Sequence, residues 1–410
     1  MTEEDSRITE LNKMRKKANS GGGEKRIKKQ HKKGKLTARE RLDQLLDSGS
    51  FHEMGAFIIR RDDFNYPEQE KYLGDGVITG YGQINGRTVF TYAQDFTVMG
   101  GALGEMQSQK ICNIMDLAAQ NGVPIIGLID SGGARIQEGI RSLGGYGEIF
   151  RRNALCSGVV PQISLILGPC AGGAAYSPAL TDFIIMVEKQ SYMFLTGPSV
   201  IKSVTGEVID FESLGGAEIH LGTSGTAHLI AKKESGALSL CRTILSYLPN
   251  NNMENPPRYA PADNPTRKDK TLNSIVPIDP SIPYNMHNVI LRVVDHNSFL
   301  ELQSTFATNA IIGFARMNGC TVGIVAQEPS IIAGVIDINA ADKICRFVRF
   351  CDCFNIPLIT FVDSPGFLPG VNQEHRGIIR LGVYFFFTVS AFMVPKISIV
   401  TRKAYGGAYV

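Results

Sequence analysis

The feature that most constrains the fold of this chain is an internal duplication. When the sequence is shifted by 233 positions, residues 321–366 align with residues 88–133 without a gap, and 13 of the 46 aligned positions are identical. The identities include an Ala-Gln pair, a Lys-Ile-Cys triplet and the Asp-Ser of "DSGG" and "DSPG". Self-similarity of this kind predicts that the 410-residue chain contains two copies of one structural unit.

Each copy has the pattern of a parallel strand-helix-strand unit. In the first copy an apolar run at 88–94 predicts a buried strand, and a helical stretch follows at about 104–121. A Val-Pro pair ends that helix, and "IIGLID" predicts a second buried strand. The second copy repeats this plan, with "LITFVD" as its last strand. The pattern predicts an α/β fold whose ligands bind at the carboxyl ends of parallel strands, where both copies carry glycines.

Composition divides the chain further. The first 47 residues contain 14 Lys and Arg against 8 Asp and Glu, whereas the whole chain has a net charge of only +3. No aromatic residues interleave with the lysines of this segment, which argues against nucleic-acid binding and favours a surface arm docked on the body. The predicted organisation is a basic N-terminal arm with a helix (1–47), a first domain (48–250), a Pro-rich linker (251–283) and a second domain (284–410).

Several classes of protein are disfavoured by the sequence. The eight cysteines include no CxxC pair and the seven histidines no ligand spacing, so we expect neither a disulfide framework nor a metal site. The acidic start is unlike a secretory or transit peptide, which favours a cytoplasmic protein, or a mitochondrial matrix protein in a eukaryote. The apolar stretch 382–394 is too short for a membrane span, so we expect a buried element there and no membrane insertion.

The stretch "GPCAGGAAYSPAL" (168–180) carries the clearest chemical signal. It predicts an apolar strand, a turn at Gly172 and Gly173, and a helix that begins with small residues. Such a turn leaves backbone N–H groups without partners and lets a ligand approach closely. Two such donors stabilise the negative charge that develops on a carbonyl oxygen, as enolate chemistry on a thioester requires. Close packing of a helix on a strand is the alternative explanation for these glycines.

These residues also carry a family resemblance. "GPCAGGAAY" resembles the oxyanion loop of crotonase-fold enzymes, and "AGVIDI" (333–338) resembles a second loop of the same fold. Two copies in one chain, together with "GKLTARERLDQLLDSGSF", "DSGGARIQEG", "FLTGPSVIKSVTGE" and "TRKAYGGAY", resemble the carboxyltransferase subunits of biotin-dependent acyl-CoA carboxylases. The resemblance implies two tandem crotonase-like domains. Family members extend past "KAYGGAYV", so it also implies that the second domain is truncated at its C-terminus.

The resemblance implies a reaction and the residues that perform it. A carboxyl group would pass from carboxybiotin to the α carbon of a short-chain acyl-CoA, propionyl-CoA giving methylmalonyl-CoA, through enolate and biotin anions. The amides of Gly172 and Gly173 would hold the thioester oxygen, and those of Gly334 and Val335 the biotin oxygen. The expected CoA channel residues are Gly132, Gly133, Ala134 and Arg135, with a nearby carboxylate as the alternative partner of Arg135. Asp337 would sort acyl groups, or would simply cap a helix.

The resemblance also implies partners and alternatives. No biotinylation motif is present, so biotin would arrive on a biotin carboxylase or biotin carrier subunit, and the chain would form a homo-oligomer, a trimer of dimers. One alternative is the α subunit of a methylmalonyl-CoA decarboxylase or a transcarboxylase subunit, in which the transfer runs toward biotin. A second alternative is a truncated, inactive chain that only associates.

Overall fold

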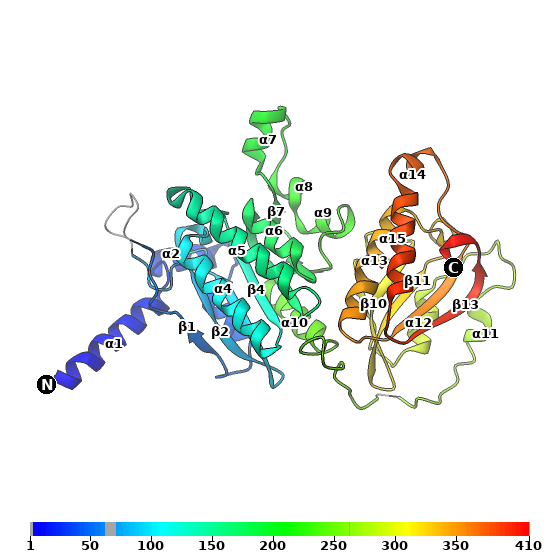
Figure 1. The fold of residues 1–410 in the computed structure, drawn as a ribbon, viewed down its shortest axis with the longest axis horizontal. Coiled ribbons are helices and arrows are strands. Elements are labelled where there is room, and N and C mark those ends of the chain that lie inside the picture. The colour runs from blue at the N-terminus through cyan, green and yellow to red at the C-terminus, as the bar shows by residue number, and fades with distance from the viewer. Residues whose placement is uncertain (1–2, 62–70, 262, 410) are drawn as a thin grey trace. The chain divides into compact units, whose positions relative to one another are not determined.

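The computed structural model describes residues 3–61, 71–261 and 263–409. The chain divides into two compact units (Figure 1). The first contains Met1–His220 and Leu229–Ile244, and the second contains Leu221–His228 and Leu245–Val410. The basic arm therefore belongs to the first unit, and the Pro-rich segment 251–283 belongs to the second.

The first unit is built on an eight-stranded sheet in which β1 to β6 follow one another and β8 lies at the far edge, while β7 pairs with β5. The strands are β1 (His52–Met54), β2 (Val77–Ile84), β3 (Arg87–Gln94), β4 (Ile125–Ser131), β5 (Gln162–Ala171), β6 (Phe183–Val187), β7 (Tyr192–Phe194) and β8 (Leu229–Ala231). Pairing is antiparallel for β1, β2 and β3 and parallel from β3 onward. Every residue of β4 is buried, as expected for a central strand of a parallel sheet.

Helices cover this sheet. Figure 1 shows α4, α5 and α6 side by side, and α4 packs on β2 and β3. The helices of this unit and its boundary are α1 (Glu3–Asn19), α2 (Glu24–Lys32), α3 (Ala38–Leu45), α4 (Glu105–Asn121), α5 (Ile140–Cys156), α6 (Gly173–Leu180), α7 (Pro198–Thr205), α8 (Phe211–Gly215), α9 (Ala217–Gly222) and α10 (Glu234–Leu245). Short 3-10 turns lie at η1 (Met99–Gly101) and η2 (Ile136–Glu138).

The second unit has a five-stranded sheet with the order β13-β12-β11-β10-β9. Its strands are β9 (Leu300–Leu302), β10 (Ala310–Met317), β11 (Cys320–Gln327), β12 (Leu358–Ser364) and β13 (Lys396–Ala404). Its helices are α11 (Leu272–Ile275), α12 (His287–Val293), α13 (Ile338–Cys353), α14 (Val371–His375) and α15 (Ile378–Ala391), with 3-10 turns at η3 (Ile332–Gly334) and η4 (Gly406–Ala408). Apolar side chains of α12 pack with those of β10, β11 and β12 in one core cluster.

The predicted duplication is confirmed element by element. β10, β11, η3 and β12 each lie 233 positions after β2, β3, η1 and β4, and α13 begins 233 positions after α4. The antiparallel register also repeats, since Val77 pairs with Gln94 and Ala310 with Gln327. Both loops before the repeated helices place consecutive residues at positive φ. The two units therefore present equivalent loops at equivalent strand ends.

A buried lysine recurs in the two copies. Lys110 of α4 donates to the carbonyls of Gly74 and Val77, and Lys343 of α13 donates to four carbonyls between Gln303 and Ala310. Burial lowers the pKa of each lysine to about 8. Each ammonium group thus ties the helix to the loop that precedes the first long strand of its copy.

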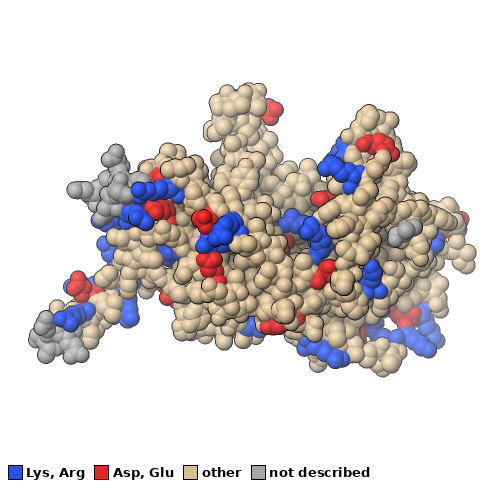
Figure 2. All heavy atoms as spheres, viewed as in Figure 1, with Lys and Arg blue, Asp and Glu red and all other residues tan. Residues whose placement is uncertain are grey.

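The arm is docked on the first unit, as predicted. Thr37 begins α3 with a capping box, because its side chain accepts from the N–H of Glu40 while the Glu40 carboxylate accepts from the N–H of Thr37. Leu42 and Leu45 are fully buried. On the face seen in Figure 2, Lys and Arg lie interspersed with Asp and Glu, in keeping with the near-neutral body.

One prediction about burial is wrong. The apolar stretch 382–394 was expected to be a buried element, but it forms most of α15 and the residues after it, and Val383, Phe387 and Met393 are exposed. The physical reason is that α15 packs on α13 along one side only, so its opposite side carries apolar groups outward. No helix in the described part of the chain is long and apolar enough to span a membrane.

Candidate active site

The Gly172–Gly173 turn joins β5 to α6, as the sequence predicts. Gly172 lies at φ 60° and ψ −127°, a conformation that side chains strongly disfavour. Its N–H donates to the carbonyl of Phe194, so this amide is already engaged. The N–H groups of Gly173 and Ala174 donate to no acceptor among the described residues. The unpaired donors of the turn are therefore those of Gly173 and Ala174, one position later than the predicted pair.

Gly173 has a second reason to be glycine. A Cβ built on it would lie 2.7 Å from the ring of Tyr146, whereas a Cβ on Gly172 would meet only the Leu195 carbonyl at 3.8 Å. Tyr146 comes from α5 and is buried against this turn. Gly173 is half-buried and Ala174 is buried, so the Gly173 N–H is the more accessible donor. Both explanations considered for the glycine pair, close packing and an exposed donor, hold for Gly173.

The "DSGG" segment lies beside this turn. Gly133 has φ 107°, and a Cβ on it would lie 3.0 Å from the carbonyl oxygen of Ala171, the last residue of β5. The N–H of Gly132 donates to the Gly100 carbonyl at 3.0 Å, and Ala134 forms an isolated bridge with Leu103. Residues 132–134 thus connect the loop after β3 with the turn after β5, at the carboxyl ends of three neighbouring strands.

Arg135 points inward and lies away from solvent. Its side chain is buried and contacts Asp75 at 2.7 Å and Glu138 at 3.1 Å, and it also donates to two backbone carbonyls. Burial raises the pKa of Asp75, an effect that Arg135 opposes. Of the two partners that the sequence left open, the structure favours the nearby carboxylate. Arg135 stabilises the loop, and its guanidinium is not available to a phosphate group of CoA.

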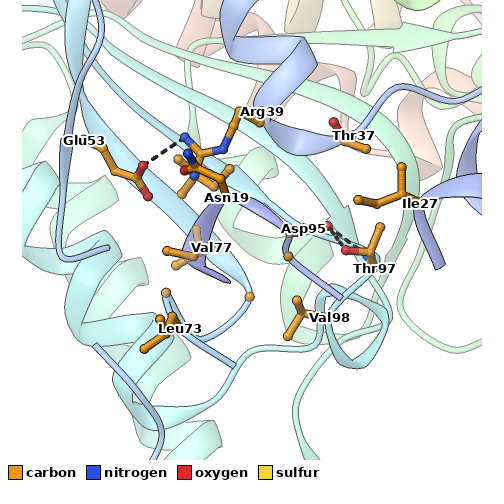
Figure 3. A pocket seen from close by; sticks show the side chains of 15 residues that line it. Asn19, Ile27, Thr37, Arg39, Glu53, Leu73, Val77, Asp95, Thr97 and Val98 are labelled. Atoms are coloured by element: carbon orange, nitrogen blue, oxygen red, sulfur yellow. Dashed lines mark hydrogen bonds and ion pairs between the residues drawn. The ribbon is translucent and has the colours of Figure 1, made fainter. Parts of the chain in front are cut away.

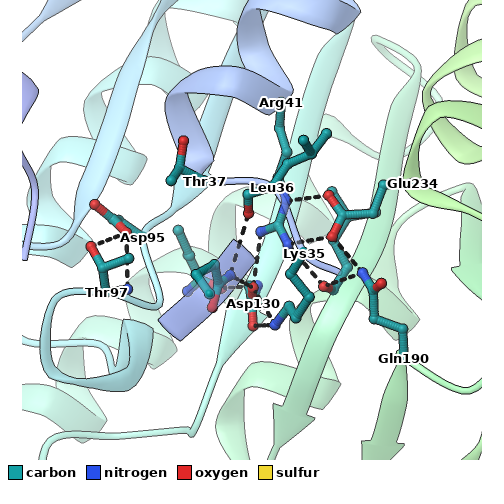
Figure 4. A network of polar contacts seen from close by, with 12 residues as sticks. Lys35, Leu36, Thr37, Arg41, Asp95, Thr97, Asp130, Gln190 and Glu234 are labelled. Atoms are coloured by element: carbon teal, nitrogen blue, oxygen red, sulfur yellow. Dashed lines mark hydrogen bonds and ion pairs between the residues drawn. The ribbon is translucent and has the colours of Figure 1, made fainter. Parts of the chain in front are cut away.

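A buried charge network lies behind the same strand ends (Figure 4). The Asp130 carboxylate accepts from Lys35 at 2.8 Å, from Arg41 at 2.9 Å and from Gln30 at 3.3 Å. Arg41 also forms two hydrogen bonds with Glu234, and Gln190 reaches the same carboxylate. Burial lowers the pKa of Lys35, although Asp130 opposes that shift. Asp130 therefore binds the arm to the end of β4.

A small hollow lies where the arm meets β2 (Figure 3). Figure 3 shows the apolar side chains of Ile27, Val77 and Val98 around it, with the Arg39–Glu53 ion pair of 2.9 Å at one side. Asp95 lies near it and is bonded to the hydroxyl and N–H of Thr97. Burial raises the pKa of Asp95. The arm forms one side of this hollow through Ala18, Asn19 and Ile27.

The second predicted donor pair lies at η3. The Gly334 N–H donates to Ile331 at 2.9 Å, and the Val335 N–H donates to Ile332 at 3.3 Å, which is longer than the usual range for such bonds. Ala102 makes the equivalent 3.3 Å bond in the first copy. Asp337 caps α13 by accepting from the Ala340 N–H at 2.9 Å, and Asn309 donates to it. The capping role of Asp337 is thus observed, and its role in acyl selection stays a prediction.

A charged cluster anchors this second loop. Glu328, which follows β11, accepts from the side chain of Ser330 and from the N–H of Met286. His287 lies 3.4 Å from Glu328 and 2.9 Å from Glu301. Hydrogen bonds to Glu301 and Glu328 raise the pKa of His287 to about 9. The first copy uses Asp95 and Thr97 at the equivalent positions, so sequence spacing alone would have indicated this anchor.

Comparisons with known proteins agree with this arrangement. Residues 29–410 match the model of the carboxyl transferase domain. The chain is 56% identical over 409 residues to the propionyl-CoA carboxylase, carboxyltransferase subunit, of Haloferax mediterranei, which covers 100% of this chain and 79% of that protein. It is 54% identical to the methylmalonyl-CoA decarboxylase subunit alpha of Veillonella parvula, over 96% of this chain and 77% of that protein.

A solved structure has the same fold. The transcarboxylase 12S core, described as a hexamer with methylmalonyl-coenzyme A and methylmalonic acid bound, matches with a TM-score of 0.97 and 51% identity. The match covers 100% of this chain and 80% of that one. The predicted crotonase-like carboxyltransferase fold is therefore confirmed. The chain belongs to the carboxyl transferase domain family.

Proposed function

We propose that this chain transfers a carboxyl group between biotin on a partner protein and the α carbon of a short-chain acyl-CoA, converting propionyl-CoA to methylmalonyl-CoA. The names of its relatives, propionyl-CoA carboxylase and methylmalonyl-CoA decarboxylase, both describe this exchange. The observation that carries the proposal is the accessible, unpaired N–H of Gly173 at the beginning of α6. A donor of this kind stabilises charge that develops on a thioester oxygen.

The residues around Gly173 position that donor. The Gly172 N–H is fixed by Phe194, and the Tyr146 ring packs against Gly173, so the turn is held on both sides. The positive end of the α6 dipole adds to the field at the same point. We propose that the thioester oxygen accepts from Gly173, with Ala174 as the neighbouring donor. We propose that the N–carboxyl bond of carboxybiotin would break, that the biotin nitrogen released in this way would take the α-proton, and that the α carbon would form a bond to the transferred carboxyl carbon.

We propose that biotin binds at the second loop. The Val335 N–H is held by a long bond, and the loop presents backbone donors with positive φ at Ile332 and Ala333. The Gly334 N–H is already bonded to Ile331 at 2.9 Å, so of the predicted pair Gly334 and Val335 we propose the Val335 N–H as the donor to the ureido oxygen of biotin, where negative charge develops. Carboxybiotin supplies the carboxyl group. Asp337, at the end of this loop, is the residue we propose for acyl selection.

The partners follow from the same proposal. A biotin carrier subunit delivers the carboxyl group, and copies of this chain assemble so that the first half of one faces the second half of another, in a trimer of dimers. The hexameric transcarboxylase core supports this assembly. We also propose that the protein is cytoplasmic. The opposite direction of transfer, toward biotin, is supported by the decarboxylase relative.

A reconstituted reaction tests the proposal. The full chain is incubated with propionyl-CoA and a carboxylated biotin carrier, and methylmalonyl-CoA is measured by mass spectrometry. In the reverse assay, methylmalonyl-CoA and uncarboxylated carrier should give propionyl-CoA and carboxylated carrier. The expected result is product in both directions that depends on the carrier. Failure in both directions, with folded protein, would reject the function and also the alternative of a decarboxylase subunit.

A further inference from the structure

A buried asparagine connects two residues of the second loop. Asn309, the residue before β10, is only 4% exposed. Its side-chain Nδ2 donates to the Val335 carbonyl at 2.8 Å and to Oδ1 of Asp337 at 3.1 Å. Both partners are acceptors only, so the NH₂ group of the amide must face them, and its two N–H bonds are both used. One side chain therefore sets the positions of Val335 and Asp337 together.

The peptide group that follows Val335 is bonded on both sides. Its carbonyl accepts from Asn309, and its N–H, that of Ile336, donates to the Gly366 carbonyl at 3.0 Å. Because a peptide group is planar, these two bonds fix the orientation of the whole group. The Val335 N–H lies on the other side of the same Cα atom. Its direction thus depends on the bond that Asn309 makes.

Asp337 uses only one carboxylate oxygen within the fold. Oδ1 accepts from Asn309 and from the Ala340 N–H at 2.9 Å. Oδ2 accepts no hydrogen bond from the residues that the structure describes, and Asp337 is half-buried. The two bonds to Oδ1 hold the carboxylate in one orientation, and Oδ2 is left available to a ligand.

The loop that carries Asn309 is itself fixed. The Asn309 carbonyl accepts from the N–H of Glu328, which follows β11, at 2.9 Å. Lys343 of α13 donates to four carbonyls between Gln303 and Ala310, on both sides of Asn309. The asparagine therefore stands in a preset position, and its amide group holds the second loop against a fixed support.

The first copy fastens the equivalent carbonyl by another residue. Ala102 lies 233 positions before Val335, and its carbonyl accepts from Nε of Arg135 at 2.8 Å. The position equivalent to Asn309 is Gly76, which has no side chain to make such a bond. Each copy thus holds this carbonyl with a buried polar side chain, although the side chain comes from a different segment. The bond is specific to the place in the loop and not to the residue that makes it.

We propose that Asn309 is a positioning residue for carboxyl transfer. Through Val335 it orients the N–H that receives biotin, and through Asp337 it orients the carboxylate that selects the acyl group. Since both of its amide hydrogens are used, Asn309 acts through these two residues and not on a substrate. The inference rests on the proposed function and deepens it, because it makes biotin binding and acyl selection depend on one side chain.

Hydrogen exchange tests the positioning without requiring any reaction. Exchange of residues 332–338 is measured in the full chain and in an Asn309→Ala variant, and we expect it to be roughly tenfold faster in the variant, as for the loss of one buried hydrogen bond. Asn309→Ser, which is too short to reach both acceptors, is a second variant with the same expected result. Unchanged exchange of this segment in a folded Asn309 variant would overturn the proposal.

Asn355→Ala is the matched control. The Asn355 side chain also donates to two oxygens, the carbonyls of Asn252 and Glu254, but it lies beyond the opposite end of α13. Its loss should lower the unfolding temperature and leave exchange of residues 332–338 unchanged. If this variant accelerated exchange there equally, the effect of Asn309 would be general destabilisation and the proposal would be rejected.

A double-mutant cycle tests the link to acyl selection. The ratio of kcat/KM for propionyl-CoA to that for acetyl-CoA is measured for Asn309→Ala, Asp337→Ala and the double variant. Each single change should lower the ratio by roughly fivefold or more, a fraction of what one methylene group is worth. The double variant should match Asp337→Ala, because Asn309 acts through that carboxylate. A further fall in the double variant would contradict this link.

The two experiments separate this inference from the proposed function. If the unmodified chain transfers no carboxyl group, the proposed function fails, while hydrogen exchange still shows whether Asn309 holds the loop. If transfer occurs and the Asn309 variants keep the exchange rate and the acyl ratio of the unmodified chain, the positioning role fails and the proposed function stands.

Discussion

At the scale of single residues, two glycines in sequence serve different purposes. Gly172 is required by its backbone conformation, since residues with a Cβ adopt φ 60° with ψ −127° only at a high energetic cost. Gly173 is required by its surroundings, because the Tyr146 ring occupies the space that a Cβ would need. The Gly173 N–H is unpaired and can donate to a ligand, whereas the N–H of Gly172 is bonded to the carbonyl of Phe194.

Replacing Gly173 tests this distinction. A Gly173→Val variant should push the turn away from Tyr146 and displace its N–H, and we expect kcat to fall by roughly 10²–10³-fold, the usual effect of losing one such donor. Carboxyl transfer is measured together with the unfolding temperature. A Gly147→Ala variant in α5, where an added Cβ meets nothing, is the matched control and should keep its activity.

A second substitution shows whether the cause is steric. If the Tyr146 ring displaces the turn, a Gly173→Ala/Tyr146→Ala double variant should recover part of the activity that Gly173→Ala loses, and the two changes should not be additive. Additive losses would mean that Tyr146 has another role. Contact with the Tyr146 ring would then not explain the loss of activity in the Gly173 variants.

At the scale of elements, the two loops are held by different charges. Asp95 in the first copy is held by Thr97, whose hydroxyl also accepts from the N–H of Gly22 in the arm. Glu328 in the second copy is held by Ser330 and faces His287. Glu328 is therefore paired with a histidine, whereas Asp95 is bonded to a threonine hydroxyl.

This pairing predicts a pH dependence of the second loop that is due to His287. The folded state raises the pKa of His287 from 6.5 to about 9, so protonated His287 stabilises the loop fully below pH 6.5. That stabilisation decreases as pH rises toward 9 and is lost above it. Hydrogen exchange of residues 328–336, corrected for the intrinsic pH effect, should accelerate between pH 7 and 9.5.

Two histidine variants provide the comparison. His287→Gln should remove this pH dependence, and His296→Gln should leave it unchanged, because His296 is exposed and pairs with Asp263 at the other end of α12. An identical exchange profile in the His287→Gln variant would contradict the anchoring role. The groups that face His287 are Glu301 and Glu328, and Lys343 lies near Glu301, so their substitution is avoided in this test.

At the scale of the whole molecule, the duplication predicts that an active site needs donors from both copies. If the first half of one chain faces the second half of another, two inactive variants should complement each other. Gly173→Val removes the first donor, and Val335→Pro removes the second, with a φ of −64° that proline accepts. Random mixed assemblies should recover about a quarter of the full activity, because half of the sites in each mixed dimer are intact.

The mixing experiment has a clear negative outcome. Activity that stays at zero after co-expression, in assemblies shown to contain both variants, would place both donors of each site within one chain. Separately purified and mixed proteins serve as the control for subunit exchange.

The sequence predicted local elements better than side-chain partners. The duplicated strands and helices, the β5–α6 turn and the docked arm could be predicted because periodicity and small residues determine them locally. The partner of Arg135 could not, since Asp75 lies 60 positions away and only the folded loop brings them together. The engaged Gly172 N–H depends on β7, whose pairing with β5 no local pattern indicates.

The Asp130 network gives the arm a role in folding. Arg41 and Lys35 are the cations that face Asp130, and Arg41 also faces Glu234. Removing one partner of a buried ion pair typically costs about 3–5 kcal/mol. A chain that starts at Glu24 should therefore fold, whereas a chain that starts after Arg41 should be insoluble or protease-sensitive. Soluble, resistant protein from the shorter chain would contradict this expectation.

It follows that the beginning of the polypeptide cannot organise itself independently of its middle. Asp130 is synthesised about ninety residues after Arg41, and Glu234 about another hundred residues later. During translation, Arg41 therefore cannot form its buried ion pairs until both carboxylates have been synthesised. Stable docking of the arm therefore requires nearly the whole first unit. A nascent chain interrupted before residue 234 lacks Glu234, the last carboxylate that holds Arg41.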